Sequence, residues 1–425
     1  MITVGLDFGT HQTKVCIERK ERAELEYSFL KFEDSRGQLC YTLPSIISIQ
    51  PDGHLRYGHI PSDDQGTIIR YFKQAVFSGS YSSTMPQKDA MLYSIWYLAY
   101  ILFDLEKRYG QTFAIQMGAP TDSGHLSRAK RIAVQILASA YGLVEELFEG
   151  NKQEFLNTTI EDLRYLTEIR EYSDYDKQSF NILVFPEAYA CLNPLVKQGK
   201  VSNGMSVMFD IGGGTTDISF FTIENKLPQV YDFFSINRGL NFLTDSDPSD
   251  SHRKDANSVA TDLKDYRIRE YQRQVNDEFN KLYQRIVSNF KHHTRLSVEK
   301  LKDALRNRPL IFCGGGSTFG QLRRPYAGFN ELRLISDREW NTTSVLDMDE
   351  IREKRLCPIL STAYGLSISR ANDDISRKPF SDLFADLRRY VEDTTHPMSK
   401  SYRRPSDFGS ALGGFSYIDD WSALK

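Results

Sequence analysis

The chain has 425 residues, of which 40% are hydrophobic and 26% are charged, an ordinary balance for globular protein. Its formal net charge of -3 gives no overall basic field, which argues against binding to nucleic acid or to an anionic membrane. The five cysteines are scattered and never form a C-x-x-C pair, so we expect no disulfides, no zinc site and a cytoplasmic location. The most apolar run, "MLYSIWYLAYILFDL", is shorter than the ~20 residues that span a bilayer and predicts a buried helix instead of a transmembrane segment.

The first part of the chain predicts a hairpin followed by an insertion. "ITVGLDFGTHQTKVCIE" has β-branched residues on both sides of a turn at Gly9, a pattern typical of a β-hairpin. Turn signals and one helix, over residues 90–108, then predict an inserted subdomain from about residue 28 to about residue 110. "FAIQMGAP" predicts a strand, and "SRAKRIAVQILASAYG" predicts a helix that ends at Gly142.

The order then repeats in outline. Strand "NILVF", helix "EAYACLNPLVKQG" and strand "SVMFD" lead to the glycine turn "DIGGGTTD" and strand "DISFFTI". Because the two hairpins, at 4–17 and 207–223, share an aspartate and a glycine turn, they predict a duplicated architecture. After a polar loop over 244–262 we expect a charged helix over 266–290, a short helix capped by Ser297, strand "PLIFC", the glycine run "GGGSTFGQL" and a helix in "CPILSTAYGLSISR".

Three turns carry the chemistry: "GLDFGT", "DIGGGTTD" and "GGGST". Successive glycine N–H groups can cradle a polyphosphate, and threonine hydroxyls add donors without bulk. Asp7 and Asp210 each end an apolar strand and are placed to hold water on Mg²⁺, which keeps several waters and binds through one or two carboxylates plus phosphates. Each turn alone also fits an ordinary hairpin or helix start, but their order along the chain favours a nucleotide site.

Five short stretches resemble the actin-like ATPase superfamily, which includes the DnaK-type heat-shock chaperones, actin and hexokinase. "GLDFGT" and "FDIGGGTTDIS" look like its two phosphate loops, "IFCGGGSTFGQL" like its adenosine loop, and "VFPEAYACL" and "STAYGLSIS" like its two connecting helices. The nucleotide-binding domain of the DnaK-type chaperones is the most similar branch. This resemblance implies an α/β fold of two lobes, each with a duplicated five-stranded mixed sheet flanked by helices. Lobe I would cover 1–200 with an insertion at about 28–110, lobe II 201–370 with an insertion at about 240–307, and a tail 371–425.

The resemblance also implies ATP or ADP with Mg²⁺ in the cleft between the lobes. Asp7, Asp210 and Asp217 would surround the hydrated metal, and Asp210, Lys73 and Glu187 would be catalytic, with Asp210 orienting the attacking water. The implied phosphate- and adenosine-binding residues are Gly9, Thr10, His11, Gly212, Gly213, Gly214, Thr215, Gly315, Gly316, Ser317, Glu278 and Lys281.

Several of these residues have a second interpretation. Lys73 also fits a lysine on an exposed helix face, and Glu278 with Lys281 also fits a surface ion pair. His11 stands where the chaperones have a second threonine and also fits turn surface. The order Pro186 then Glu187 is the reverse of the chaperone order and is nearer to plasmid-segregation filament proteins.

The expected function is that of a DnaK-like nucleotide-binding protein that hydrolyses ATP slowly to switch its affinity for a protein partner. The chain after Gly365 is too short for the client-binding domain of a complete chaperone. A filament-forming protein of the plasmid-segregation type, a phosphotransferase such as a sugar kinase, and a binding module without hydrolysis remain alternatives. The segment "LGGFSYIDDW" near the end suggests either partner docking or packing on the protein's own surface.

Overall fold

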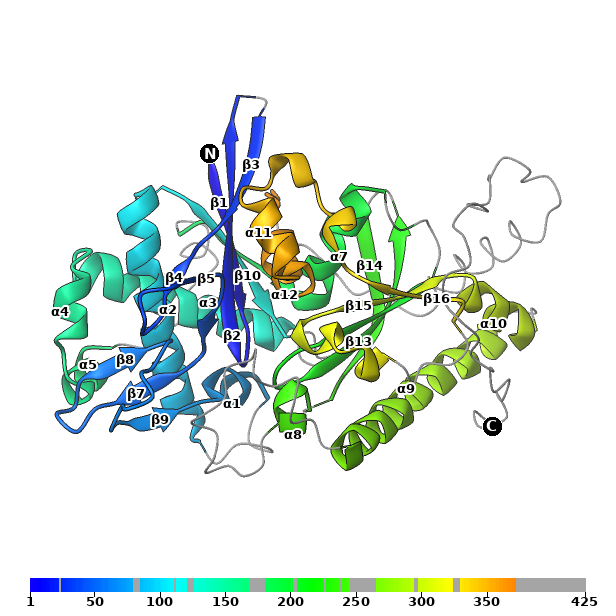
Figure 1. Ribbon diagram of the computed structural model, residues 1–425, viewed down its shortest axis with the longest axis horizontal. Coiled ribbons are helices and arrows are strands. Elements are labelled where there is room, and N and C mark those ends of the chain that lie inside the picture. The colour runs from blue at the N-terminus through cyan, green and yellow to red at the C-terminus, as the bar shows by residue number, and fades with distance from the viewer. Residues whose placement is uncertain are drawn as a thin grey trace.

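Two mixed β-sheets with helices around them form the protein (Figure 1). The computed structural model describes residues 1–22, 24–78, 85–110, 112–120, 126–167, 180–199, 201, 205–224, 227–236, 238–244, 265–293, 297–323 and 329–371. The expected loop at 244–262 and the expected tail at 371–425 lie outside these residues, apart from the first residue of each.

The first sheet has the strand order β11-β10-β1-β2-β3, and the short strand β6 also pairs with β2. β1 pairs antiparallel with β2 and parallel with β10, while β3 continues the antiparallel side and β11 the parallel side. The strands are β1 (Ile2–Phe8), β2 (Gln12–Glu21), β3 (Glu24–Phe29), β6 (Leu43–Pro44), β10 (Ala114–Ala119) and β11 (Ile182–Pro186). The hairpin expected around Gly9 is therefore confirmed as β1–β2.

The second sheet has the order β14-β13-β12-β15-β16. β12 pairs antiparallel with β13 and parallel with β15, with β14 and β16 outside them in the same senses. These strands are β12 (Ser206–Ile211), β13 (Thr216–Glu224), β14 (Leu227–Ile236), β15 (Pro309–Cys313) and β16 (Glu331–Leu334). Each sheet thus has three antiparallel strands followed by two parallel ones, and the first sheet has β6 in addition. The expected pair of mixed sheets flanked by helices is confirmed.

The chain between β3 and β10 carries additional strands and helices. They are β4 (Phe32–Glu33), β5 (Leu39–Cys40), β7 (Ile47–Ile49), β8 (Leu55–Tyr57), β9 (Thr67–Ile69), α1 (Phe72–Ser78) and α2 (Gln87–Tyr109). α2 contains the most apolar run of the sequence and is buried on most sides, with Trp96 and Tyr97 fully enclosed. The expected buried helix is confirmed, and no helix of the described residues is long and apolar enough to cross a membrane.

After β10, the α-helix α3 (Leu126–Tyr141) ends directly before Gly142, as expected. A π-helical turn, η1 (Gly142–Leu147), follows it, and this turn buries the apolar side chains of Leu143 and Val144. Two short helices, α4 (Lys152–Leu156) and α5 (Ile160–Leu166), follow before β11.

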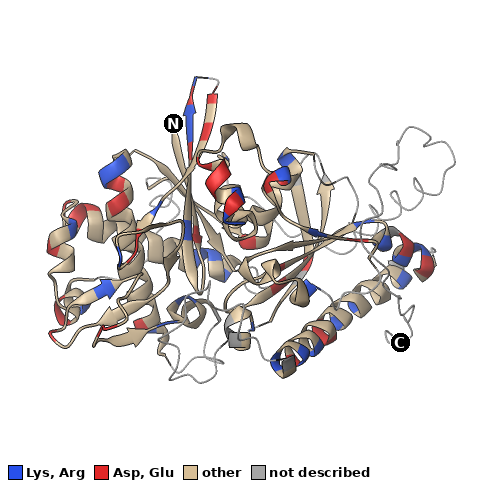
Figure 2. Ribbon diagram, viewed as in Figure 1, with Lys and Arg blue, Asp and Glu red and all other residues tan. Residues whose placement is uncertain are grey.

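The chain between β14 and β15 is helical among its described residues. It contains α8 (Leu240–Thr244), α9 (Asp265–His293) and α10 (Val298–Arg306). Basic and acidic residues alternate along α9 and α10 (Figure 2), as the charged helical pattern predicted. The side chain of Ser297 accepts a hydrogen bond from the backbone N–H of Lys300, so the expected N-cap of α10 is confirmed.

Two helices that cross each other join the sheets. α7 (Glu187–Lys197) follows β11 of the first sheet and packs on β14 of the second, whereas α12 (Cys357–Ser367) follows the second sheet and packs on β1 and β2. A Cβ atom at Gly365 would overlap the carbonyl oxygen of Ala190, so the backbones touch at the crossing. The side chain of Asn193 also donates a hydrogen bond of 3.1 Å to the Gly365 carbonyl.

The chain that leads into α12 passes from the second sheet to the first. It comprises η3 (Gly315–Thr318), η4 (Gly320–Arg323), η5 (Asp337–Glu339), η6 (Thr342–Ser344) and α11 (Met348–Glu353) around β16. η3 contacts β12 and β15 of the second sheet, whereas η6 contacts β3 of the first. Trp340 and Tyr364 pack with Tyr27 and Phe29 of β3 in one buried aromatic cluster. Residues 340–368 therefore pack against the first sheet, although the expected division at residue 200 grouped them with the second.

Candidate functional site

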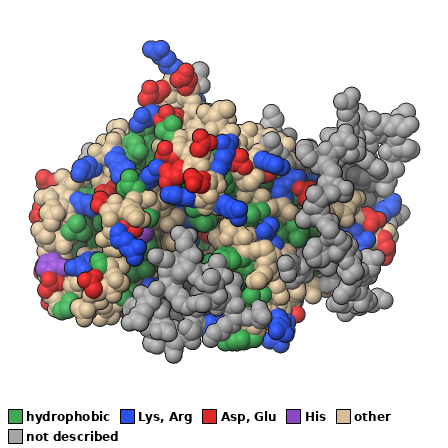
Figure 3. Space-filling view, in the orientation of Figure 1, with side chains coloured by type: hydrophobic (Ala, Val, Ile, Leu, Met, Phe, Trp, Pro, Cys, Tyr) green, Lys and Arg blue, Asp and Glu red, His purple; other side chains and the backbone are tan. Residues whose placement is uncertain are grey.

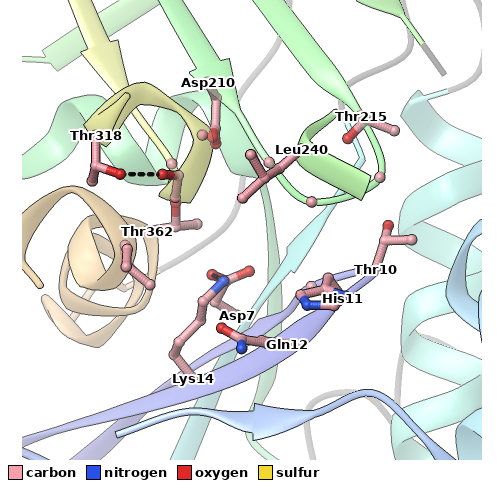
Figure 4. Close-up of a pocket in the computed structure, with 18 of the residues that line it drawn as sticks. Asp7, Thr10, His11, Gln12, Lys14, Asp210, Thr215, Leu240, Thr318 and Thr362 are labelled. Carbon is pink, nitrogen blue, oxygen red and sulfur yellow. Dashed lines mark hydrogen bonds and ion pairs between the residues drawn. The ribbon is translucent and has the colours of Figure 1, made fainter. Parts of the chain in front are cut away.

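A cleft of about 530 Å³ lies where the tips of the hairpins β1–β2 and β12–β13 face each other (Figure 4). Its size is that of a small-molecule or cofactor site. The residues expected from the sequence that line it are Asp7, Gly9, Thr10, His11, Lys73, Glu187, Asp210, Gly212, Gly213, Gly214, Thr215, Asp217, Gly315 and Gly316. Segments separated by up to about three hundred residues of sequence are thus brought to one place.

Three expected residues do not line this cleft. The hydroxyl of Ser317 is buried and donates a hydrogen bond of 2.6 Å to the Gly314 carbonyl, so it shapes the turn. Glu278 and Lys281 lie on α9 in a separate depression and form an ion pair with an N–O distance of 2.7 Å. Because they are three residues apart on an exposed helix face, they satisfy each other. The surface ion pair that the sequence also allowed is the arrangement observed.

The first hairpin contains a carboxylate with its own counter-ion. Asp7 of β1 lies opposite Lys14 of β2, and the Nζ and Oδ2 atoms are 3.0 Å apart. Burial alone lowers the pKa of Lys14, but the charges of Asp7, Asp210 and Glu187 outweigh it and hold the pKa above its usual range. Sequence reasoning missed Lys14, although its signal was present: pairing across a turn at Gly9 places residue 14 opposite residue 7.

The second hairpin places two carboxylates opposite each other. Asp210 of β12 is the cross-strand partner of Asp217 of β13. Burial, followed by the negative charges of Asp217, Asp7 and Glu187, raises the pKa of Asp210 to about 7. Burial and the charge of Glu187 likewise raise the pKa of Asp217 to about 6, against hydrogen bonds from the Ser235 and Thr215 hydroxyls. A cation that enters the cleft would therefore stabilise the ionised forms of both carboxylates.

Lys73 is buried rather than exposed, so the expectation of a lysine on an exposed helix face is wrong. Its side chain, on α1, is 5% exposed and its Nζ atom lies 2.5 Å from Oε1 of Glu187. Glu187 is the first residue of α7, directly after Pro186. The Pro-Glu order therefore still brings the glutamate into the cleft, and the ion pair joins the insertion of the first sheet to a crossing helix.

The glycines of the second hairpin tip are required by close contact with the first. A Cβ atom on Gly213 would lie 2.5 Å from Cβ of His11, and one on Gly214 would lie 2.8 Å from Cγ2 of Thr10. Gly314, with φ of 80°, approaches Asp210 so closely that any side chain would overlap it. The N–H groups of Gly212 and Gly314 donate to the carbonyls of Thr215 and Pro358, and the glycines leave the rest of the tip backbone without Cβ atoms to cover it.

The charge of the lining residues fits a hydrated magnesium ion. Four carboxylates, those of Asp7, Glu187, Asp210 and Asp217, face the cleft beside the two buried lysines. Within the described part of the chain, no three His, Cys, Asp or Glu side chains stand close enough to ligate one metal ion directly. A cation in the cleft would lie among these carboxylates, whose oxygens are ligands that Mg²⁺ prefers.

At the end of the cleft away from the hairpin tips, the sequence predicted Gly315 and Gly316 but not the other lining residues. Thr318 of η3 and Thr362 of α12 lie together there, across the cleft from Thr10 and His11 (Figure 4). The hydroxyl of Thr318 donates to the Gly315 carbonyl at 2.7 Å. The additional lining residues are Gln12, Lys14, Leu240, Gly314, Thr318, Phe319, Lys354, Arg355, Leu356, Ile359 and Thr362. Leu356, Ile359 and Phe319 give this end an apolar character suited to a base or another flat ring.

No protein-family model and no curated protein matches the chain. The topology of the two sheets and the geometry of the cleft therefore carry the functional argument.

Proposed function

We propose that this protein is an actin-like nucleotide-binding protein, most similar to the nucleotide-binding domain of DnaK-type chaperones, that binds Mg-ATP in the cleft and hydrolyses it slowly. One observation carries the proposal. Two sheets of the same topology present equivalent hairpins tip to tip, and each hairpin ends its first strand with an aspartate that faces one cleft. An arrangement with two acidic strand ends and glycine turns suits a polyphosphate with its cation.

Binding would rest on the backbone of the two tips and on the lysines. The N–H groups of Thr10, Gly213 and Gly214 would contact the phosphates, because those of Gly9 and Gly212 already donate to the carbonyls of Asp7 and Thr215. Lys14 and Lys73 would offset the charge of the phosphates. The apolar end near Leu356 would take the base. Magnesium, when bound, would neutralise charge on the phosphates next to the carboxylates.

Hydrolysis would depend on Asp210. A carboxylate with a pKa raised to about 7 can both orient a water molecule and accept its proton near neutral pH. The remaining contributions are positioning and charge, which is the general pattern for phosphoryl transfer to water. The direct contact between α7 and α12 at Gly365 would pass a change in the cleft to both sheets and so alter affinity for a protein partner.

The test combines nucleotide binding with phosphate release. We expect the purified protein to bind Mg-ATP, and we expect Asp210→Asn to retain binding while its rate of phosphate release falls about 100-fold or more. Asp349→Asn is the matched control, because the side chain of Asp349 is 100% exposed on α11. Unchanged hydrolysis in Asp210→Asn would refute the role of Asp210, and absence of nucleotide binding in the wild-type protein would refute the proposal as a whole.

A filament-forming protein of the plasmid-segregation type is the second candidate. Pro186 and Glu187 keep the order found in that group, and the described part of the chain between β14 and β15 is a compact set of three helices. Light scattering and pelleting with Mg-ATP, Mg-ADP or no nucleotide separate the two candidates. Scattering that grows in ATP and reverses as ATP is consumed supports a filament, and a flat trace supports the switch.

A further inference from the structure

The segment 238–240, which follows β14, packs on the glycine turn of the second hairpin. The N–H of Leu240 donates a hydrogen bond of 3.0 Å to the Gly212 carbonyl. A Cβ atom on Gly239 would lie 2.5 Å from the carbonyl oxygen of Gly212 and 2.6 Å from that of Gly213, so the two backbones are in contact. Leu240 also lines the cleft (Figure 4). The shape of the turn therefore depends on where this segment lies.

Two hydroxyl groups in series link this segment to the start of β13 and to α9. The hydroxyl of Thr216, the first residue of β13, donates a hydrogen bond of 2.9 Å to the Arg238 carbonyl. The hydroxyl of Tyr271 on α9 lies 2.6 Å from the same Thr216 oxygen. Because a hydroxyl has a single hydrogen and that of Thr216 is given to Arg238, Tyr271 is the donor to Thr216. Thr216 and Tyr271 are fully buried, so water does not compete for these hydrogen bonds.

Thr216 stands between two residues that face the cleft. Thr215 and Asp217 line the cleft, whereas the Thr216 side chain lies on the opposite side of β13, as alternation along a strand requires. The N–H of Gly212 donates to the Thr215 carbonyl at 2.9 Å, which closes the turn directly before Thr216. The cross-strand partner of Asp217 is Asp210. The position of Thr216 thus sets where Asp217 meets Asp210.

α9 holds the segment after β14 by two further contacts. Arg238 donates from Nη1 to Oε1 of Glu270 at 3.1 Å, and Arg267 donates from Nη1 to the Phe242 carbonyl at 3.0 Å. Arg267, Glu270 and Tyr271 lie on one face of α9, because they are separated by three and four residues. None of these three residues lines the cleft. α9 therefore reaches the glycine turn through Thr216 and through the segment after β14.

We infer that Tyr271 is a positioning residue for the proposed reaction: its hydroxyl holds Thr216 and thereby fixes how Asp217 faces the other carboxylates of the cleft. The inference rests on the proposed function, since it requires hydrolysis in the cleft. Tyr271 supports that reaction from α9 without touching the nucleotide.

Removal of the Tyr271 hydroxyl leaves the glycine turn itself in place. Gly212 keeps its hydrogen bonds with Leu240 and Thr215, and the Thr216 hydroxyl keeps the Arg238 carbonyl. The backbone that would contact the phosphates therefore persists, whereas the start of β13 loses its contact with α9. The rate of the chemical step should fall more than the affinity for nucleotide.

The experiment measures kcat and KM for Mg-ATP hydrolysis, and the dissociation constant by calorimetric titration, for the wild-type protein and Tyr271→Phe. kcat should fall about tenfold while the dissociation constant changes by less than about twofold, because a small displacement near the reacting atoms costs more in rate than in binding. Tyr283→Phe is the matched control. Tyr283 is a buried tyrosine of the same helix, about 18 Å further along its axis, and should leave both constants unchanged.

Substitutions of Thr216 test whether Tyr271 acts through it. Thr216→Val removes both hydrogen bonds and should lower kcat at least as much as Tyr271→Phe, and Thr216→Ser, which keeps the hydroxyl, should restore most of kcat. In the double variant Thr216→Val/Tyr271→Phe, kcat should be no lower than in Thr216→Val alone, since both substitutions break the same link. Additive losses would show that Tyr271 acts independently of Thr216 and would overturn the inference.

Amide hydrogen exchange of the nucleotide-free protein tests the structural link without the reaction. Tyr271→Phe should speed exchange about tenfold in peptides that contain residues 211–217 and 238–242, and should leave peptides of the first hairpin, 4–17, unchanged. Faster exchange at the turn without a change in kcat would show that the hydroxyl is structural only, which overturns the inference.

The remaining outcomes are distinguishable from one another. Unchanged kcat, or equal losses of kcat and affinity, in Tyr271→Phe would remove Tyr271 as a positioning residue while the proposed function stands. A wild-type protein that does not bind Mg-ATP, or binds it without hydrolysis, would refute the proposed function before any variant is compared, and the inference with it. Thermal unfolding checks that each variant is folded, and the pair Thr216→Val and Thr216→Ser carries the same test if Tyr271→Phe does not fold.

Discussion

The two hairpins that face the cleft have the same topology, but they differ in the charge of one cross-strand pair. In each, an aspartate at the end of the first strand pairs across the turn with the residue seven positions later. That partner is Lys14 in the first hairpin and Asp217 in the second. The first hairpin is therefore neutral at this pair, whereas the second places two half-buried carboxylates opposite each other.

Because of this difference, we expect one hairpin to serve mainly stability and the other mainly function. Like charges directly opposite in a sheet are destabilising, and here burial adds to the cost, so the pKa values of both carboxylates rise. The first hairpin balances its charged pair without a ligand. The carboxylates of the second hairpin are only partly offset by Lys14 and Lys73, so a cation in the cleft would stabilise their ionised forms further. We therefore expect the first pair to contribute to folding and the second to respond to the cleft's contents.

The largest effect should come from breaking the balanced pair. Lys14→Met removes the counter-ion and leaves Asp7, whose side chain is 8% exposed, without its partner. The free energy of unfolding, measured in denaturant without magnesium, should fall by about 3–5 kcal/mol. Lys300→Met, at an exposed position of α10, is the matched control. A loss below about 1 kcal/mol would show that the pair does not stabilise the first hairpin.

The second prediction concerns substitutions that remove the difference in charge between the hairpins. Asp217→Lys gives the second hairpin the pairing of the first, and Asp217→Asn removes only the like charge. In EDTA, both should raise the free energy of unfolding by about 1–2 kcal/mol, because the buried carboxylates no longer repel. Mg-ATP hydrolysis should fall about 100-fold in Asp217→Lys. A lower melting temperature of both variants in EDTA would contradict the proposed repulsion.

A smaller effect concerns a paired carboxylate outside both hairpins. Glu350 of α11 accepts hydrogen bonds from Lys31 at 2.9 Å, Lys354 at 2.7 Å and Tyr41 at 2.5 Å, and these hold its pKa at about 2. Acidic and basic side chains gather over α11 in the space-filling view (Figure 3). The ionised form of Glu350 is therefore stabilised by its partners, whereas the raised pKa of Asp210 shows that its ionised form is destabilised.

The sign of its pH effect follows from the lowered pKa. The stabilisation from Glu350 is fully present above its unfolded pKa of about 4.3 and is lost as the pH falls through about 2. Glu350→Gln should therefore flatten the decline of thermal stability between about pH 4.5 and pH 2. Glu353→Gln, an exposed acid on the same helix, should leave the decline unchanged. A variant curve parallel to the wild-type curve would refute the contribution.

The smallest effect is expected on α9. Because Lys281 is 67% exposed and pairs with Glu278 outside the cleft, Lys281→Ala should change the dissociation constant for Mg-ATP by less than about twofold. Stability should change by less than about 0.5 kcal/mol. Calorimetric titration and thermal unfolding measure both. A tenfold loss of ATP affinity would show that Lys281 contributes to nucleotide binding and would contradict this prediction.

Much of the fold could be predicted because its signals are local. Glycine turns between β-branched runs indicated both hairpins, and the apolar run of α2 indicated a buried helix. The strands β3, β14 and β16 were not predicted, because their pairing depends on the neighbouring strand more than on their own pattern. In the site, the acids and glycines were predicted, but Lys14 and the residues before α12 were not.

By itself, the sequence determined which backbone stretches can approach a polyphosphate and which strands end in a carboxylate, since both depend on residues adjacent in the chain. Only the tertiary structure decided what lies opposite each carboxylate, that Lys73 is buried against Glu187, and that α12 returns to the first sheet. These depend on register and on packing between segments far apart in sequence, where long-range contacts and burial set the energies. The charge balance of the cleft, and with it the difference between the two hairpins, arises at that level.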